Sequence, residues 1–128
     1  MYYRLSILIS RINLAKAQRI DSFKIMNTKI SVGFLMKLED IGVIRGFEME
    51  SDKLHVFMKY VNNRVPFTNI KLISKPSRTY PISINKLSQI IDKHGSSVFI
   101  LSTGYGFLSH SECFAKRCSG ELVAKIDL

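Results

Sequence analysis

The sequence predicts an α+β fold, in which helices are segregated from antiparallel strands, and two observations lead to this prediction. Apolar residues recur at helical spacing in residues 3–18 and 30–41, and they alternate or run together in shorter segments that are typical of strands. Hydrophobic residues make up 46% of the chain, which predicts a packed globular protein. Its length of 128 residues is enough for one ordinary domain or for two small lobes that share a core. Helices packed on an antiparallel sheet define the α+β class.

The first third of the chain is predicted to form a helix, a short strand and a second helix. The predicted ranges are residues 3–18, 22–26 and about 29–41. Asn27 and Thr28 can cap the second helix, and Gly42 can end it in a left-handed turn. The first twenty residues contain no acidic residue and also resemble a transit peptide, but their apolar stripe fits the first helix of the fold.

The middle of the chain is predicted to form a hairpin and one more strand. Val43–Met49 and Leu54–Val61 are two strands joined at Glu50–Lys53, and Thr68–Ile73 is a third. Ser74–Pro81 follows, with two prolines, two serines and no apolar run, so its composition is that of a linker.

The C-terminal part begins with a helix and contains a strand that ends abruptly. The predicted elements are a helix over Ile84–Lys93, strands over Val98–Leu101 and Glu121–Ile126, and a short helix over His110–Arg117 capped by Ser109. Ser102–Gly106 follows the first of these strands with two hydroxyls, two glycines and an aromatic ring. Such a loop can offer N–H groups and hydroxyls to phosphate or ribose, and its ring can stack on a base.

The charge distribution favours a polyanionic partner. The formal net charge is +9, and neither residues 1–20 nor residues 53–91 contain an acidic residue, whereas residues 39–52 hold five of the ten acids. Nucleic acid is the first candidate for such a partner, although an anionic membrane or an acidic protein would also fit. No apolar run is long enough to predict a transmembrane helix.

Residues outside the Ser102–Gly106 loop could extend a nucleic-acid-binding surface. The candidates are Lys75, Arg78 and Tyr80 in the linker, Arg11 and Asn13 on the first helix, and Asn27 and Lys29 at the start of the second. Each has a structural alternative, because a linker, a solvated helix face or a plain helix cap would use the same residue types.

No catalytic or metal site is predicted. Gly104-Tyr-Gly106 lacks the third glycine of a dinucleotide-binding loop, and no nucleophile elbow surrounds Ser102. The three histidines are scattered, and Cys113 and Cys118 lack the spacing of a zinc site. We therefore expect no enzymatic activity, no cofactor and no small-molecule substrate.

Three motifs occur in an order that resembles the small-subunit ribosomal protein S8 family. They are Ser74-Lys-Pro-Ser-Arg-Thr-Tyr80, Ile100-Leu-Ser-Thr-Gly-Tyr-Gly106 and Ser119-Gly-Glu121. The family carries Ser-Lys/Arg-Pro-Gly-x-Arg-x-Tyr, Ser-Thr-Ser-x-Gly and Gly-Gly-Glu in the same order. The N-terminal half is similar too, at Leu8–Asn13, Asn27–Lys29 and Leu38–Ile44.

The resemblance implies a primary rRNA-binding protein with two lobes packed together. Residues 1–73 would form an α+β lobe of αβαββ type, and residues 74–128 a mostly β lobe with short helices. The protein would bind a bulged stem in the central domain of small-subunit rRNA, support assembly of that domain, and contact neighbouring small-subunit proteins.

The resemblance also assigns roles to the candidate residues. Ser102, Thr103 and Gly104 would read the RNA, flanked by Lys75, Arg78 and Tyr80, while Arg11, Asn13, Asn27 and Lys29 would make a second, weaker contact. Glu121, with Gly120 beside it, would be a buried acid that braces the loop rather than a catalyst.

The sequence departs from the family pattern at five positions. Gly104 replaces a serine, Tyr105 a lysine, Ser77 and Ser119 glycines, and Phe114 an arginine. The loop therefore lacks one hydroxyl and one charge, although Tyr105 could stack on a base. This drift and the Ile/Phe-rich composition favour a mitochondrial member, with a bacterial or plastid ribosome as the alternative.

Two other functions remain open from the sequence. A free-standing RNA-binding regulator of translation would use the same residues away from the ribosome. An enzyme acting on nucleotides is supported only by Gly104-Tyr-Gly106.

Overall fold

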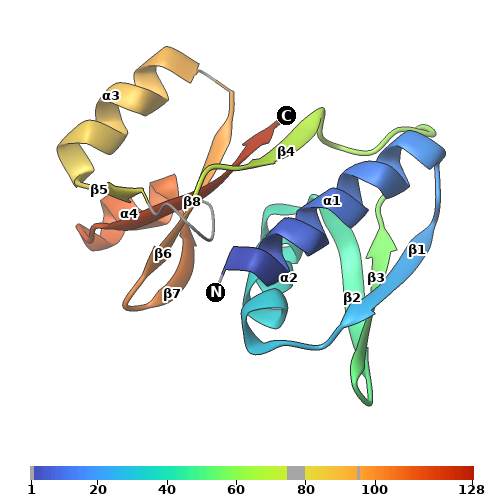
Figure 1. Cartoon of the computed structure of the whole chain (residues 1–128). Coiled ribbons are helices and arrows are strands. Elements are labelled where there is room, and N and C mark those ends of the chain that lie inside the picture. The colour runs from blue at the N-terminus through green and yellow to red at the C-terminus, as the bar shows by residue number, and fades with distance from the viewer. Residues whose placement is uncertain (1, 75–79, 95) are drawn as a thin grey trace. The chain divides into compact units, whose positions relative to one another are not determined.

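The structure, a computed structural model, describes residues 2–74, 80–94 and 96–128. It is an α+β fold, as predicted, and its contacts divide the chain into one compact unit over Met1–Thr68 and a second over Asn69–Leu128 (Figure 1). The predicted division into lobes over residues 1–73 and 74–128 stays a prediction.

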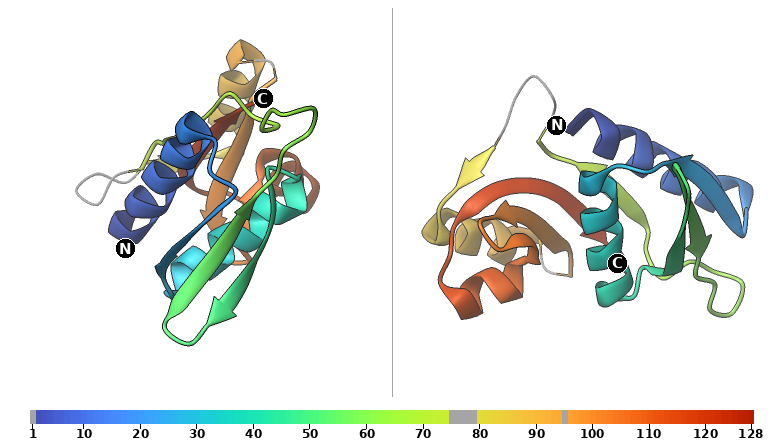
Figure 2. Two further views of the ribbon diagram at one scale, coloured as in Figure 1. Left: turned by 90° about the vertical axis from the view of Figure 1, so that its right-hand side faces the viewer. Right: turned by 90° about the horizontal axis from the view of Figure 1, so that it is seen from below.

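The first unit packs two helices on one face of a three-stranded antiparallel sheet (Figure 2). Its elements are α1 (Tyr2–Gln18), β1 (Ser22–Met26), α2 (Lys29–Ile41), β2 (Ile44–Glu50) and β3 (Lys53–Met58), with sheet order β1-β3-β2. Leu5 and Ile12 of α1, Phe34 of α2 and Val56 of β3 are fully buried, as the helical and alternating patterns require.

The predicted caps of α2 are present. The Thr28 side chain accepts a hydrogen bond from the N–H of Ser31, and Gly42 ends the helix at φ 95° with its N–H bonded to Leu38 and Glu39 carbonyls. Because Thr28 is used in this way, the helix start is fixed by local hydrogen bonds.

The second unit is built around a strand that pairs with three others. Its elements are β4 (Asn69–Leu72), β5 (Pro81–Ile82), α3 (Ile84–His94), β6 (Val98–Thr103), β7 (Gly106–Ser109), α4 (His110–Lys116) and β8 (Gly120–Asp127). The sheet order is β4-β8-β6-β7, and β5 also pairs with β8. All of these pairings are antiparallel.

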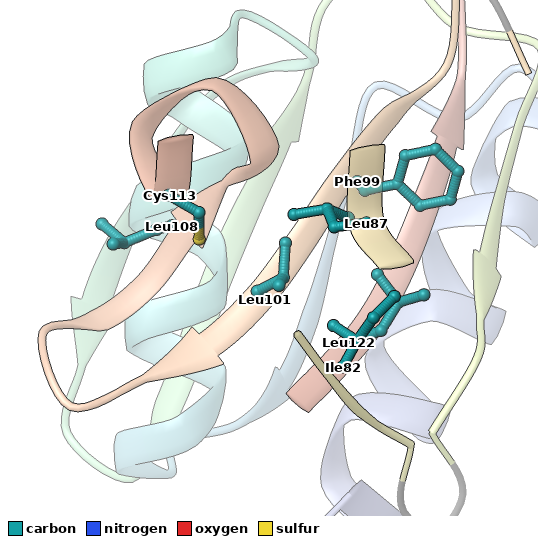
Figure 3. Close-up of a cluster of buried hydrophobic side chains, with 7 residues drawn as sticks. All are labelled: Ile82, Leu87, Phe99, Leu101, Leu108, Cys113 and Leu122. Atoms are coloured by element: carbon teal, nitrogen blue, oxygen red, sulfur yellow. The ribbon is translucent and has the colours of Figure 1, made fainter. Parts of the chain in front are cut away.

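A buried cluster holds the second unit together. Figure 3 shows its side chains, which come from β5, α3, β6, β7, α4 and β8: Ile82, Leu87, Phe99, Leu101, Leu108, Cys113 and Leu122. Each large apolar side chain of this kind stabilises the fold by roughly 1.5–3 kcal/mol relative to an exposed one. The cluster therefore packs the β6–β7 hairpin against β8.

Three strand predictions need correction. The strand expected over residues 68–73 spans Asn69–Leu72 and pairs with β8, so it belongs to the second sheet. The strand expected over residues 54–61 ends at Met58. The strand expected to stop at Leu101 continues to Thr103 and turns back into β7, which was not predicted.

Candidate nucleic-acid interface

The predicted RNA-reading loop is the tight turn of the β6–β7 hairpin. Thr103 and Gly106 form the last pair of the hairpin, so only Gly104 and Tyr105 lie in the turn between them. Gly106 has φ 95°, the left-handed conformation that often follows such a turn and that glycine adopts without strain. The turn is therefore shorter and more regular than the five-residue loop expected from the sequence.

The Thr103 hydroxyl holds this turn in shape. It donates a hydrogen bond to the carbonyl oxygen of Gly106 and accepts one from the N–H of Tyr105, both at 3.0 Å. The donor hydrogen of Thr103 is thus used inside the turn. Ser102 is half-buried beside it, and its hydroxyl has no hydrogen-bond partner among the described residues. Ser102 is therefore the hydroxyl that can donate to a ligand.

Gly120 and Glu121 lie directly behind the turn on β8. Glu121 is the register partner of Ser102. A Cβ on Gly120 would collide with the carbonyl oxygen of Ser102 and would lie 3.0 Å from Thr103 Cγ2, so only glycine fits there. Glu121 is half-buried, not buried as expected, and it takes part in at least one hydrogen bond or electrostatic interaction.

Tyr105 projects from the turn and is 68% exposed. The Lys116 ammonium lies 4.8 Å from the centre of its ring, within the range of a cation–π interaction. Arg117, which follows α4 and is exposed, adds a second cation at this end of the helix. Neither cation is among the residues predicted from the sequence to bind RNA, although two adjacent basic residues at a helix end are a recognisable signal.

An open depression adjoins β8, the strand that lies behind the turn. Its volume is about 510 Å³, and it is lined by Pro81, Ile82, Ser83, Lys86, Ser119, Gly120 and Glu121. Gly120 and Glu121 thus border the depression while they also back the turn. Lys86 and Glu121 give its lining one basic and one acidic side chain.

Of the linker candidates, only Tyr80 can be located. Lys75 and Arg78 lie outside the described residues. Tyr80 is 44% exposed, its carbonyl accepts the N–H of Leu122 at 2.8 Å, and its own N–H donates to Ser74 Oγ at 3.1 Å. Its backbone is therefore fixed on β8 while its ring remains accessible.

The remaining candidates lie in the first unit. Arg11 is exposed on α1, with its guanidinium 5.4 Å from the Phe23 ring centre, and Asn13 is half-buried with a polar contact. At the start of α2, Lys29 is exposed and Asn27 donates its N–H to the Asp52 carbonyl at 2.9 Å. Arg11 and Lys29 are accessible, so they can meet phosphates.

Across the described parts of the chain, no three metal-ligating side chains gather at one place. The same residues include no helix that is long and apolar enough to cross a membrane.

Comparisons with known proteins show similarity to one family over nearly the whole chain. The model of a family described as "Ribosomal protein S8" matches residues 4–126. "Small ribosomal subunit protein uS8m" of Acanthamoeba castellanii is 32% identical over 96% of this chain and 98% of its own length. "Small ribosomal subunit protein uS8" of Mycoplasmoides gallisepticum is also 32% identical, over 93% of each chain, and that of Pediococcus pentosaceus is 30% identical over 92% of each.

Proposed function

This chain belongs to the ribosomal protein S8 family, and from that premise we propose that it is a structural component of the small ribosomal subunit that binds small-subunit rRNA. The resemblance noted in its motifs is confirmed by the family match. The relatives at about 30% identity are named as small ribosomal subunit proteins, and this chain covers almost their whole length.

The observation that best supports RNA binding is the accessible, rigid turn at the end of β6. The Ser102 hydroxyl is available there, the exposed ring of Tyr105 can stack on a base, and the cations of Lys116 and Arg117 lie at the C-terminal end of the helix that follows. This combination of a fixed hydroxyl, an aromatic ring and phosphate-neutralising charges suits the recognition of folded RNA.

We propose further that the turn binds a bulged stem in the central domain of that rRNA, and that Tyr80, Lys75 and Arg78 contribute to the same binding. Bulged or unpaired bases can be stacked and read individually, whereas the deep groove of a regular RNA helix excludes side chains. Arg11, Asn13, Asn27 and Lys29 would supply a second contact from the first unit, and Gly120 and Glu121 would support the turn.

We propose a mitochondrial small subunit as the location, with a bacterial or plastid subunit as the alternative. A mitochondrial relative and a bacterial relative are equally similar, at 32% identity, so sequence similarity alone does not separate the two. Immunolocalisation in the source organism distinguishes them.

Co-sedimentation tests the ribosomal role. The tagged protein should migrate with small subunits in a sucrose gradient and should co-purify with small-subunit rRNA. A protein that stayed at the top of the gradient in low salt would contradict the ribosomal role and favour the alternative of a free-standing regulator.

Binding in vitro tests the turn. Ser102→Ala should weaken affinity for a transcript of the rRNA central domain by about 1–3 kcal/mol if its hydroxyl binds a base or ribose. The matched control is Ser88→Ala on the exposed side of α3, which should leave affinity unchanged. Equal affinity of the Ser102 variant and the control would contradict the assignment.

A further inference from the structure

Lys116 and Tyr105 form a pair between the last turn of α4 and the tip of the β6–β7 hairpin. The ammonium lies 4.8 Å from the ring centre, and both residues are exposed. The family pattern has a lysine where Tyr105 stands, so the turn of this chain lacks a positive charge of its own. The ammonium of Lys116 places a positive charge at the tip of the turn, although Lys116 belongs to α4 and not to the hairpin.

The position of Lys116 follows from how α4 is anchored. The helix begins with a capping box, in which Glu112 Oε1 accepts the N–H of Ser109 at 3.2 Å and Ser109 Oγ accepts the N–H of Glu112. Next to it, Nδ1 of His110 accepts the N–H of Phe99 at 3.1 Å, which ties the helix to β6. The helix start is thus held against the strand that leads to the turn.

The same capping box leaves Lys116 free of an acid on its own helix. Glu112 lies one turn before Lys116, where an ion pair would be expected, but its carboxylate is engaged at the helix start. No carboxylate among the described residues forms an ion pair with Lys116. Within the described part of the chain, its charge is therefore not balanced by an ion pair.

The position of Tyr105 is equally constrained. Its N–H is bonded to the Thr103 hydroxyl, and the flanking Gly106 is held in the left-handed conformation. The ring therefore leaves the turn in a defined direction, and the ammonium of Lys116 covers one of its faces.

We propose that Lys116 is an RNA-phosphate contact of this protein and that the Tyr105 ring positions it at the tip of the turn. This inference rests on the proposed function and adds a residue to the binding surface. A free lysine side chain samples many rotamers, and holding its ammonium over the ring reduces the entropy lost when it binds a phosphate. Tyr105 thereby acts as a positioning residue for Lys116.

Salt-dependent affinity for a transcript of the rRNA central domain tests the inference. Lys116→Met should weaken binding about three- to tenfold at 0.1 M salt and should reduce the slope of log affinity against log salt by about one phosphate contact. Lys116→Arg should restore most of the affinity, because arginine also binds phosphate and stacks on aromatic rings.

Lys93→Met is the matched control, since Lys93 is an exposed lysine on α3 of the same unit. It should change neither affinity nor salt slope beyond a small nonspecific effect. Urea unfolding should show that both variants keep the stability of the parent protein.

Positioning by Tyr105 is tested in a double-mutant cycle with Tyr105→Leu, which removes the ring and keeps an apolar side chain. The loss caused by Lys116→Met should be at least twofold smaller in the Tyr105→Leu background. Equal losses in the two backgrounds would overturn the positioning role of Tyr105.

The outcomes separate this inference from the proposed function. If Lys116→Met matches Lys93→Met while the parent protein binds with normal salt dependence, only the Lys116 contact is overturned. If the parent protein itself shows no salt-dependent binding to the transcript, the proposed function is overturned and this inference with it.

Discussion

The backbone of Gly120 lies so close to the carbonyl of Ser102 that no side chain fits between β8 and the end of β6. A Cβ on Gly120 would lie 3.1 Å from the carbonyl carbon of Ser102 and would overlap its oxygen. Because both obstacles are backbone atoms, they cannot move aside as a flexible side chain could. This close approach holds the end of β6, which leads into the turn, against β8.

Gly120→Ala should therefore destabilise the protein. The added methyl group would force the two strands apart, and overpacking of this kind lowers the free energy of unfolding by about 1–3 kcal/mol. Urea unfolding with an unchanged m-value measures the loss.

Gly104→Ala is the control for that substitution. Nothing lies within 4 Å of a Cβ on Gly104, so this variant should unfold at the parent urea concentration or slightly above it. Equal stability of the two alanine variants would show that the approach of Gly120 to Ser102 is not a constraint.

Gly104→Ser should increase RNA affinity without a cost in stability. It restores the hydroxyl that the family carries at this position, and the open space around Gly104 accommodates the side chain. One net hydrogen bond corresponds to about 0.5–1.5 kcal/mol, or roughly a two- to tenfold change in affinity. Filter binding or fluorescence anisotropy measures it, and weaker binding by the serine variant would contradict the role of the turn.

Thr103→Val should loosen the turn, whereas Thr103→Ser should preserve it. Valine has the shape of threonine but lacks the hydroxyl that binds the Tyr105 N–H and the Gly106 carbonyl. The amide of Tyr105 should then exchange with solvent faster, and RNA affinity should fall by about 1 kcal/mol. Amide exchange followed by NMR provides the measurement, and unchanged exchange in the valine variant would rule out this hydrogen bond.

His110 should make stability dependent on pH. Burial lowers the pKa of His110 below its usual 6.5, and its Nδ1 must stay unprotonated to accept the N–H of Phe99. Because the unfolded chain binds the proton more readily, this contribution is fully present above pH 6.5 and is lost as the pH falls through the lower, folded pKa.

Urea midpoints measured between pH 7.5 and 5 test this dependence. His110→Asn is the control, because its side-chain oxygen can accept the same N–H but does not titrate. The midpoint of the parent protein should decrease more steeply toward low pH than that of the variant. Parallel decreases would assign the pH dependence to other groups.

The two cysteines should differ in reactivity. Burial, the largest cause, raises the pKa of Cys113 to about 12, and the neighbouring Cys118 thiol adds to this effect. Cys118 is half-buried, so an alkylating reagent should modify it first in the native protein, and both should react in urea. Peptide mass spectrometry identifies the modified residue, and rapid alkylation of native Cys113 would contradict the buried position.

Elements with local signals could be predicted from the sequence. The helix pattern and caps of α2, with Thr28 before it and Gly42 after it, act within a few residues, and so does the capping residue Ser109 of α4. The family could be inferred as well, because its motifs keep their order along nearly the whole chain.

Features that depend on distant residues could not be predicted. β5 has two residues and begins with a proline, so neither periodicity nor strand propensity indicates it. The pairing of β4 with β8 joins segments more than fifty residues apart. The pair of Tyr105 and Lys116 depends on the direction in which α4 leaves the hairpin, which no spacing rule gives.

The pairing of β8 with β4, more than fifty residues earlier in the chain, has a consequence for the order of folding. β6, β7 and α4 are consecutive and can associate with little loss of chain entropy, whereas β8 must also capture β4 from far along the chain. The hairpin and its turn can therefore form early in folding, whereas β4 joins the sheet later. Substitutions where β4 pairs with β8 should accordingly speed unfolding more than they slow folding.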